Sequence, residues 1–313
     1  MVLSNLLIYL LSFVGVWVGA GLAISSVERL SKNLKLSSFA LSFIILGFFT
    51  SLSEFSVGVN ALTVNDPEIY VGNLIGATIV IFMMIVPLLA ITGSKIKITK
   101  EFGGVSLVLS LVTIAMPVLL SIDGEVSQSD GIVAMALFVI LVIIIQTKRG
   151  LFNANDGLKK LSSIKTGREF LKILLGVVII FIASRFVVDQ TIFFSELLHV
   201  SPFLISLLII GIGTNIPELT LVVRSMFMKS NQVAFGDYVG SAAFNTFIFG
   251  LLTFLHGKPV YLSNSYLVSL LFLIVGLIVF YYFSRTNNSV SRLEGFLLLM
   301  LYLLFVFVEI LIH

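Results

Sequence analysis

The chain has 313 residues, of which 58% are hydrophobic and only 11% are charged, and its formal net charge is +3. Soluble domains carry about one-quarter charged residues, so this composition excludes an ordinary water-soluble protein. An apolar surface of this size would not be tolerated in water, and we therefore expect an integral membrane protein that faces lipid.

Membrane-spanning helices need about 20 largely apolar residues. Runs of this kind follow one another along the chain and predict ten transmembrane helices, so the expected fold class is an all-α polytopic membrane protein. The expected spans are residues 4–26, 39–64, 70–92, 104–121, 130–147, 170–190, 202–228, 235–256, 261–283 and 293–312.

The loops between these spans sort by charge. If the basic linker at residues 148–168 is cytoplasmic, every second loop carries lysine or arginine and the alternate loops are acidic, with Lys258 as the one basic exception. This asymmetry predicts a cell-membrane protein with both termini outside. The positive charge lies in short loops rather than on a soluble module, so it does not indicate a nucleic-acid partner.

An internal repeat relates the two halves of the chain. A shift of 164 residues aligns residues 36–93 with residues 200–257 without a gap. Each half, 1–147 and 169–313, contains five expected helices, an odd number, so the second half must enter the membrane in the opposite orientation. Two inverted-topology five-helix repeats are typical of secondary transporters, whose sites lie near the bilayer midplane. The coincident residues include Gly47 with Gly211, Thr50 with Thr214, Glu54 with Glu218, Gly72 with Gly236, and Gly76 with Gly240.

Glu54 and Glu218 each lie near the middle of an apolar run. A charged carboxylate at that depth costs at least about 2.5–3.5 kcal/mol on insertion scales. Two carboxylates that converge from opposite repeats repel each other unless a proton or a cation lies between them. The repeated pair therefore favours a cation site over two protonated glutamates that merely hydrogen-bond neighbouring helices.

Neutral oxygen atoms accompany the two glutamates. Thr50 and Thr214 precede them by one helical turn on the same face, and Ser51 and Asn215 follow the threonines directly. Pro217 lacks an N–H group, so it is expected to break its helix and to free a carbonyl group. Hard cations such as calcium and sodium prefer oxygen ligands of this kind.

The helices that follow the glutamates begin with Gly-xxx-Gly, a spacing that permits close approach of neighbouring backbones. In the second repeat, Ser241 and Asn245 come next and share one helix face. The first repeat has Ala77 and Ile81 at the equivalent positions, so the predicted polar lining is asymmetric.

The segments Gly213-Thr-Asn-Ile-Pro-Glu218 and Gly236-Asp-Tyr-Val-Gly-Ser-Ala-Ala-Phe-Asn245 resemble the second alpha-repeat of the calcium/cation antiporter superfamily, closest to the prokaryotic sodium/calcium exchangers. The resemblance covers nearly the whole chain. It implies that the first and sixth helices slide against the site-bearing helices, and that two glutamates bind calcium beside two threonine carbonyls. The implied calcium ligands are Glu54, Glu218, Thr50 and Thr214, and the residues implied to complete the sodium sites are Ser51, Asn215, Ser241 and Asn245.

The first repeat departs from the family pattern at four positions. Phe49 replaces a glycine, Ser53 replaces a proline, Ala77 replaces a serine and Ile81 replaces an asparagine. Two side-chain ligands are thereby lost, and the pattern gives less support for a helix break in the first repeat.

We expect a secondary-active cation antiporter that exports calcium in exchange for sodium by alternating access. We expect a monomer without a cofactor, whose partners are small inorganic cations and the lipid bilayer, with transported Ca²⁺ and Na⁺ (or H⁺) as bound ions. A proton-coupled or altered-selectivity exchanger, favoured by Ala77 and Ile81, is an alternative, and so is a non-transporting cation-binding membrane sensor. An enzyme is not expected, because the sequence has no cysteine and no recognisable nucleophile–base pair.

Other intramembrane charges are expected to be structural. Arg185 and Asp189 lie four residues apart and are predicted to pair. Glu309 and Arg224 are predicted to reach a membrane interface through their long side chains.

Overall fold

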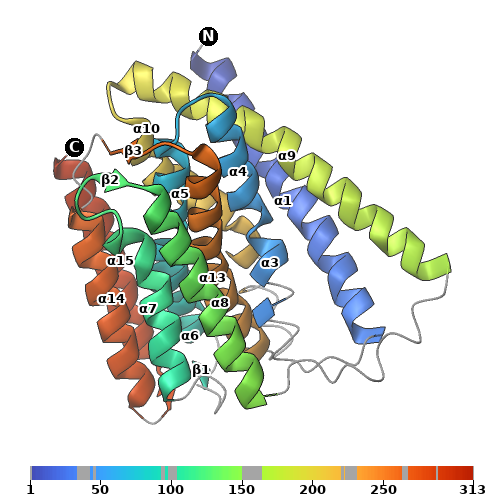
Figure 1. Ribbon diagram of the computed structural model, residues 1–313, viewed down its shortest axis with the longest axis vertical. Coiled ribbons are helices and arrows are strands. Elements are labelled where there is room, and N and C mark those ends of the chain that lie inside the picture. Colours follow the sequence, from blue (N-terminus) through green and yellow to red (C-terminus); the bar gives the residue numbers. More distant parts are fainter. Residues whose placement is uncertain are drawn as a thin grey trace.

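The computed structural model is almost entirely helical (Figure 1). It describes residues 2–33, 43–44, 47–92, 96–97, 104–149, 164–219, 222, 231–262, 267–286 and 288–312. The labelled helices are α1 (Val2–Asn33), α3 (Gly47–Thr50), α4 (Leu52–Thr63), α5 (Glu68–Val80), η2 (Ile81–Ile85), α6 (Val86–Thr92), α7 (Val105–Leu119), α8 (Gln128–Arg149), α9 (Ile164–Leu198), α10 (Pro202–Ile205), η4 (Ser206–Ile210), α11 (Gly211–Thr214), α13 (Asn231–His256), α14 (Leu267–Arg285) and α15 (Arg292–Ile312). The segments η2 and η4 are π-helical turns that continue their neighbouring α-helices.

Seven of the described helical stretches are long and apolar enough to cross a membrane, and two shorter apolar helices, 105–119 and 202–214, accompany them. Large apolar side chains such as Leu3, Leu271 and Phe307 are exposed on the outer helices, as lipid contact requires. The chain is therefore a multi-pass membrane protein. Helix is present in each of the ten expected ranges, whereas the count of ten membrane crossings stays a prediction.

The helix that contains α5, η2 and α6 lies at the centre of the bundle together with α13. Within their apolar windows, 83% and 78% of the residues are buried, against 28–39% for the other five candidate spans. Both central helices contain the Gly-xxx-Gly pattern, Gly72 to Gly76 in α5 and Gly236 to Gly240 in α13, and such small residues allow neighbouring helices to approach closely. The polar residues on these two helices consequently face protein rather than lipid.

The long helices α1 and α9 pack side by side and form an arm along one side of the bundle (Figure 1). Their backbones are close, because a Cβ atom added at Gly19 would lie 2.8 Å from the carbonyl oxygen of Gly176. At one end of the pair, Arg29 forms an ion pair of 2.8 Å with Glu169. The helix α9 is longer than the predicted span 170–190, since it continues to Leu198 through several polar residues.

Two short antiparallel strand pairs tie loops of the two halves together. Strand β1 (Ile96–Lys97) pairs with β4 (Ser289–Val290), and β2 (Glu125–Val126) pairs with β3 (Val260–Tyr261). The 164-residue shift converts β1 into β3 and β2 into β4, so the two pairings are equivalent. The strand β1 lies at one end of the bundle, and the β2–β3 pair lies at the other (Figure 1).

Three sequence-based expectations meet different outcomes. The predicted pairing of Arg185 with Asp189 is confirmed, with a separation of 3.3 Å. The prediction that Glu309 reaches an interface is wrong, because its side chain is fully buried beside Ser269 of α14. Arg224 and most of the 148–168 linker, residues 150–163, lie outside the described residues, and helices flank the linker up to Arg149 and from Ile164.

Candidate cation-binding site

Two helix breaks carry the candidate site. The helical path from Gly47 to Thr63 is interrupted at Ser51, and the path from Pro202 through α11 is interrupted at Asn215 before it resumes at residues 216–219. The two break residues are 164 positions apart and thus equivalent in the repeat. The sequence supported a break less strongly in the first repeat. That break is nevertheless present, at the position equivalent to the break in the second repeat.

Different chemistry accounts for the two breaks. In the second repeat, Pro217 has no N–H group with which to continue the helical hydrogen bonds. In the first repeat, the hydroxyl of Ser53 donates to the carbonyl oxygen of Thr50 at 2.9 Å. A serine side chain that bonds to a nearby backbone carbonyl competes with the regular helical pattern, so Ser53 stabilises a turn without proline.

All eight predicted site residues are fully buried, with an exposed fraction of 0% each. Glu54 lies in the first turn of α4, and Glu218 lies in the short helix after Asn215. The carboxylates interact electrostatically with each other, and Glu54 lies beside the Thr214 side chain of the opposite half. Glu218 in turn lies beside Thr50, so each carboxylate meets the threonine of the other repeat.

Hydrogen bonds join the two halves around these carboxylates. The Ser53 hydroxyl reaches both Oε2 of Glu54, at 2.9 Å, and the carbonyl oxygen of Thr214, at 3.1 Å. The hydroxyl oxygens of Ser51 and Ser241 are 3.1 Å apart. Oγ of Ser241 also donates to Oε1 of Glu218 at 3.1 Å. These contacts connect Ser51, Ser241 and Glu218, and they connect Glu54 to Thr214 through Ser53. The side chain of Asn215 donates only within its own helix, to the carbonyl of Gly211, and the side chain of Asn245 has no hydrogen-bond partner among the described residues.

Several buried polar atoms of the predicted site residues have no hydrogen-bond partner within the part of the chain that the structure describes. The acceptor oxygens among them are Oε1 of Glu54, Oε2 of Glu218, and the Oδ1 atoms of Asn215 and Asn245. A buried acceptor without a partner costs about 1–3 kcal/mol. Two of the four are carboxylate oxygens and two are amide oxygens, and both kinds are ligands that hard cations prefer.

Close backbone packing fixes the two halves against each other. A Cβ atom added at Gly47 would lie 2.7 Å from the carbonyl carbon of Gly240, and one added at Gly211 would lie 2.8 Å from that of Gly76. The two contacts are equivalent under the 164-residue shift. They hold α3 against α13 and α11 against α5, so that Ser51 reaches the second half.

Sequence reasoning did not select four polar residues of this region. Asn73 accepts a hydrogen bond of 3.3 Å from the Thr214 hydroxyl through Oδ1. Tyr238 donates to the backbone carbonyl of Glu218 at 3.1 Å. Asp237 is fully buried, and Ser53 was noted only as a departure from the family pattern. The internal repeat could have identified two of them. It aligns Asn73 with Asp237, and each lies four residues before a position already considered, Ala77 in the first repeat and Ser241 in the second.

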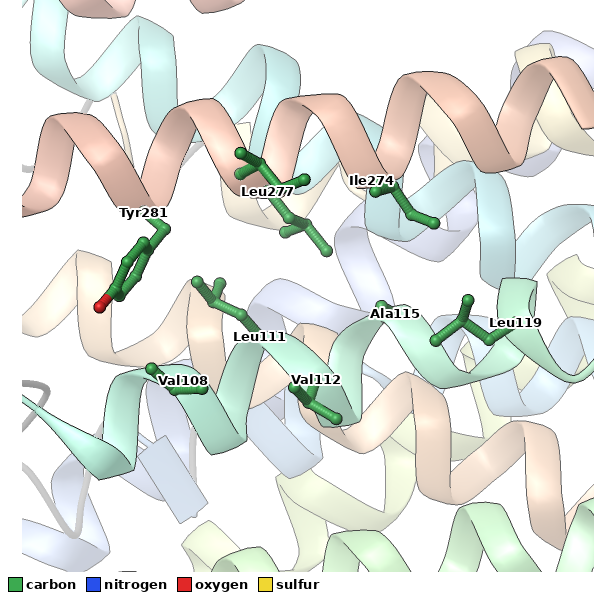
Figure 2. Close-up of a pocket in the computed structure, with 9 residues that line it drawn as sticks. Val108, Leu111, Val112, Ala115, Leu119, Ile274, Leu277 and Tyr281 are labelled. Carbon is green, nitrogen blue, oxygen red and sulfur yellow. The ribbon is translucent and has the colours of Figure 1, made fainter.

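Figure 2 shows a groove between α7 and α14 that is distinct from this site. Its volume is about 450 Å³, and its lining is apolar apart from the hydroxyl of Tyr281. Without a carboxylate in its lining, the groove offers nothing to balance the charge of a cation. It is suited to acyl chains of the surrounding lipid.

Comparisons with known proteins agree with the fold. The family described as "Sodium/calcium exchanger protein" matches the chain in two segments, residues 4–146 and 169–311. The sodium/calcium exchanger MaX1 of Methanosarcina acetivorans is 24% identical over 353 aligned positions, covering 98% of this chain and 99% of that protein. Inner membrane protein YrbG of Escherichia coli is 26% identical over 277 positions, covering 82% and 85%.

The solved structure of the sodium-calcium exchanger NCX_Mj, soaked with Na⁺ and Sr²⁺, superposes with a TM-score of 0.71. It is 21% identical, with 97% of this chain and 98% of that chain covered. At this identity the likeness shows a shared fold.

Proposed function

The chain belongs to the sodium/calcium exchanger protein family, and from that premise we propose that it exports calcium in exchange for sodium at a site between Glu54 and Glu218. Membership makes the chain a cation antiporter rather than an enzyme. Calcium, sodium and the outward direction are the specific parts of the proposal. The observation that carries it is the convergence of two buried carboxylates from opposite halves.

Charge balance explains how this pair exchanges ions. One divalent cation neutralises two carboxylates, and two monovalent cations can replace it. Without any bound cation, two negatively charged carboxylates would lie together in a low-dielectric environment, which is strongly unfavourable. The empty carboxylate pair is therefore the least favourable state, and this couples the movement of one ion to the return of the other.

The inverted repeat is part of the proposal. The equivalent strand pairings, the equivalent glycine contacts and the two matched family segments all support two five-helix halves of opposite orientation. Under this arrangement both termini lie outside the cell. The site then lies between the halves and near the bilayer midplane, as in other transporters built from inverted repeats.

Alternating access requires one part of the protein to move relative to the site. We assign this movement to the α1–α9 pair, which forms an arm along one side of the bundle (Figure 1). The ring of Phe13 on α1 packs directly on Gly213, immediately before Thr214. Sliding of α1 would uncover this face of the site on one side of the membrane and cover it on the other.

Isotope flux in proteoliposomes tests the proposal. The parent chain is expected to accumulate ⁴⁵Ca²⁺ against an opposing sodium gradient, and Glu54→Gln and Glu218→Gln are each expected to abolish this uptake. Glu309→Gln is the matched control, because it also neutralises a buried glutamate, but one that lies on α15 away from the site. Full uptake by either site variant would contradict the proposal.

A proton-coupled exchanger is the second candidate, and Ala77 and Ile81 favour it. Both side chains are fully buried, and they stand where the second repeat has Ser241 and Asn245. Fewer neutral ligands would leave less support for bound sodium. Replacement of sodium by choline under a fixed pH gradient separates the candidates, since only a proton-coupled exchanger would keep its calcium flux.

A further inference from the structure

The hydroxyl group of Ser53 lies among three acceptor oxygens. It is 2.9 Å from the carbonyl oxygen of Thr50, 2.9 Å from Oε2 of Glu54 and 3.1 Å from the carbonyl oxygen of Thr214. A serine hydroxyl has a single hydrogen, so it can satisfy only one of these acceptors at a time. The remaining oxygens form an electron-rich cluster inside the protein, and Ser53 is fully buried there.

The oxygen at this position is a property of the first repeat alone. The equivalent residue of the second repeat is Pro217, whose side chain offers no oxygen. The same first repeat lacks polar side chains at Ala77 and Ile81. The first repeat thus has one side-chain oxygen, at Ser53, that the second repeat lacks, and it lacks two polar side chains that the second repeat has.

On the basis of the proposed function, we propose that Ser53 is a ligand of the transported sodium ion. The shell would consist of Oγ of Ser53, Oε2 of Glu54 and the carbonyl oxygen of Thr214, while the hydroxyl hydrogen is donated to the carbonyl of Thr50. These atoms come from both halves of the chain, so a bound ion would hold the halves together.

Charge explains why this subsite is assigned to a monovalent cation. The cluster contains an oxygen of only one carboxylate, and a single negative charge is balanced by a single positive one. A divalent ion needs both Glu54 and Glu218 and would bind between them rather than at the Ser53 side. Oxygen ligands also match the hardness of an alkali cation.

The test compares two transport modes in proteoliposomes that contain the full chain. Sodium-dependent calcium exchange requires the proposed ligand, whereas calcium–calcium self-exchange does not require sodium. Ser53→Ala is expected to raise the half-saturating sodium concentration roughly tenfold, the size of effect expected when one polar contact to a charged group is lost. The half-saturating calcium concentration in self-exchange is expected to rise by a clearly smaller factor, because Ser53→Ala removes a hydrogen bond to Glu54 but no ligand of calcium.

Three further variants separate a ligand from a structural residue. Ser53→Thr keeps the hydroxyl and is expected to keep the parent sodium dependence. Ser53→Pro reproduces the residue of the second repeat but removes the oxygen, and Ser53→Cys substitutes soft sulfur at similar size. Both are expected to weaken sodium dependence as Ser53→Ala does, so the proposal can be tested even if one variant does not fold.

Two results would overturn the proposal. One is a parent-like sodium dependence in folded Ser53→Ala or Ser53→Cys. The other is an equal loss of sodium and calcium affinity, which a structural hydrogen bond would produce. Failure of the proposed function would give a different result from failure of the Ser53 proposal. If the proposed function were wrong, Glu54→Gln and Glu218→Gln would leave calcium self-exchange intact.

Discussion

The hydroxyl oxygens of Ser51 and Ser241 lie 3.1 Å apart, although 190 residues separate them in the chain. This contact joins the first helix break to α13 of the other half. Ser241 also donates to Glu218 at 3.1 Å, so the position of that carboxylate depends on a link between the halves. The consequences of this arrangement can be measured one residue at a time.

Removal of the Ser241 hydroxyl is expected to weaken calcium transport. Ser241→Ala deletes one hydrogen bond to Glu218, and bonds to charged groups contribute about 1.5–3 kcal/mol. The half-saturating calcium concentration should therefore rise roughly 10- to 100-fold in flux assays. Ser110→Ala is the control, because that buried hydroxyl donates within its own helix to the carbonyl of Ser106 and its loss should leave calcium affinity unchanged.

A methyl group at Gly47 is expected to disrupt the contact between the halves. The added Cβ would lie 2.7 Å from the carbonyl carbon of Gly240, and backbone atoms cannot move aside cheaply. Overpacking of this kind costs about 1–3 kcal/mol, so Gly47→Ala should lower the melting temperature in detergent and reduce calcium flux. Gly21→Ala provides the control, since nothing lies within 4 Å of the Cβ position there. Equal melting temperatures for the two variants would contradict the close approach.

The Tyr238 hydroxyl is expected to position Glu218 through its backbone. Tyr238→Phe removes the hydrogen bond to the Glu218 carbonyl, worth about 1 kcal/mol, and should lower calcium affinity roughly fivefold. Tyr70→Phe also removes a buried hydroxyl contact, the one of 2.9 Å to Thr253, and should reduce stability without changing affinity. A similar affinity loss in both variants would show that the effect of Tyr238 is not local.

Asp66, in the loop between α4 and α5, is expected to make stability depend on pH. Burial and the neighbouring Glu68 raise the pKa of the Asp66 carboxyl from 3.8 to about 6. The folded state therefore holds this proton more tightly than the unfolded chain, so the contribution is complete below about pH 4 and is lost as the pH rises through about 6. Partial exposure screens the charge, so the loss should be about 1 kcal/mol.

The matching variant is Asp66→Asn, which keeps the shape of the side chain without its charge. It should melt at a higher temperature than the parent above pH 6 and at the same temperature below pH 4. The exposed loop residue Asp123 supplies a comparison, because Asp123→Asn should not reproduce this pH-dependent gain. A gain of equal size at both pH values would contradict the role assigned to the Asp66 charge.

Much of the fold could be predicted because lipid imposes a simple requirement on sequence. Runs of apolar residues mark helices, and the coincidence of Glu54 with Glu218 in the repeat identified the pair that the structure brings into electrostatic contact. The length of α9 could not be predicted in this way. Its helix continues through Gln190 and Ser195, where a count of apolar residues ends but backbone hydrogen bonding does not.

The details of the site depended on individual side-chain contacts that patterns do not encode. The break at Ser51 was weakly supported because proline is absent, and the Ser53 hydroxyl bonds to the Thr50 carbonyl at this turn. The position of Glu309 near the end of α15 predicted that its side chain reaches the membrane interface, but the side chain is buried in the protein. Such outcomes depend on which side chains meet in space, and the chain order alone does not specify them.

Crystals of the protein grown with strontium, a heavier stand-in for calcium, give the most direct view of the proposed ion. An anomalous difference map is predicted to contain one strong peak within coordinating distance, about 2.3–2.6 Å for calcium-like ions, of carboxylate oxygens from both Glu54 and Glu218. The peak should weaken when sodium is added in excess. A strontium ion bound elsewhere, or beside only one of these glutamates, would contradict the account.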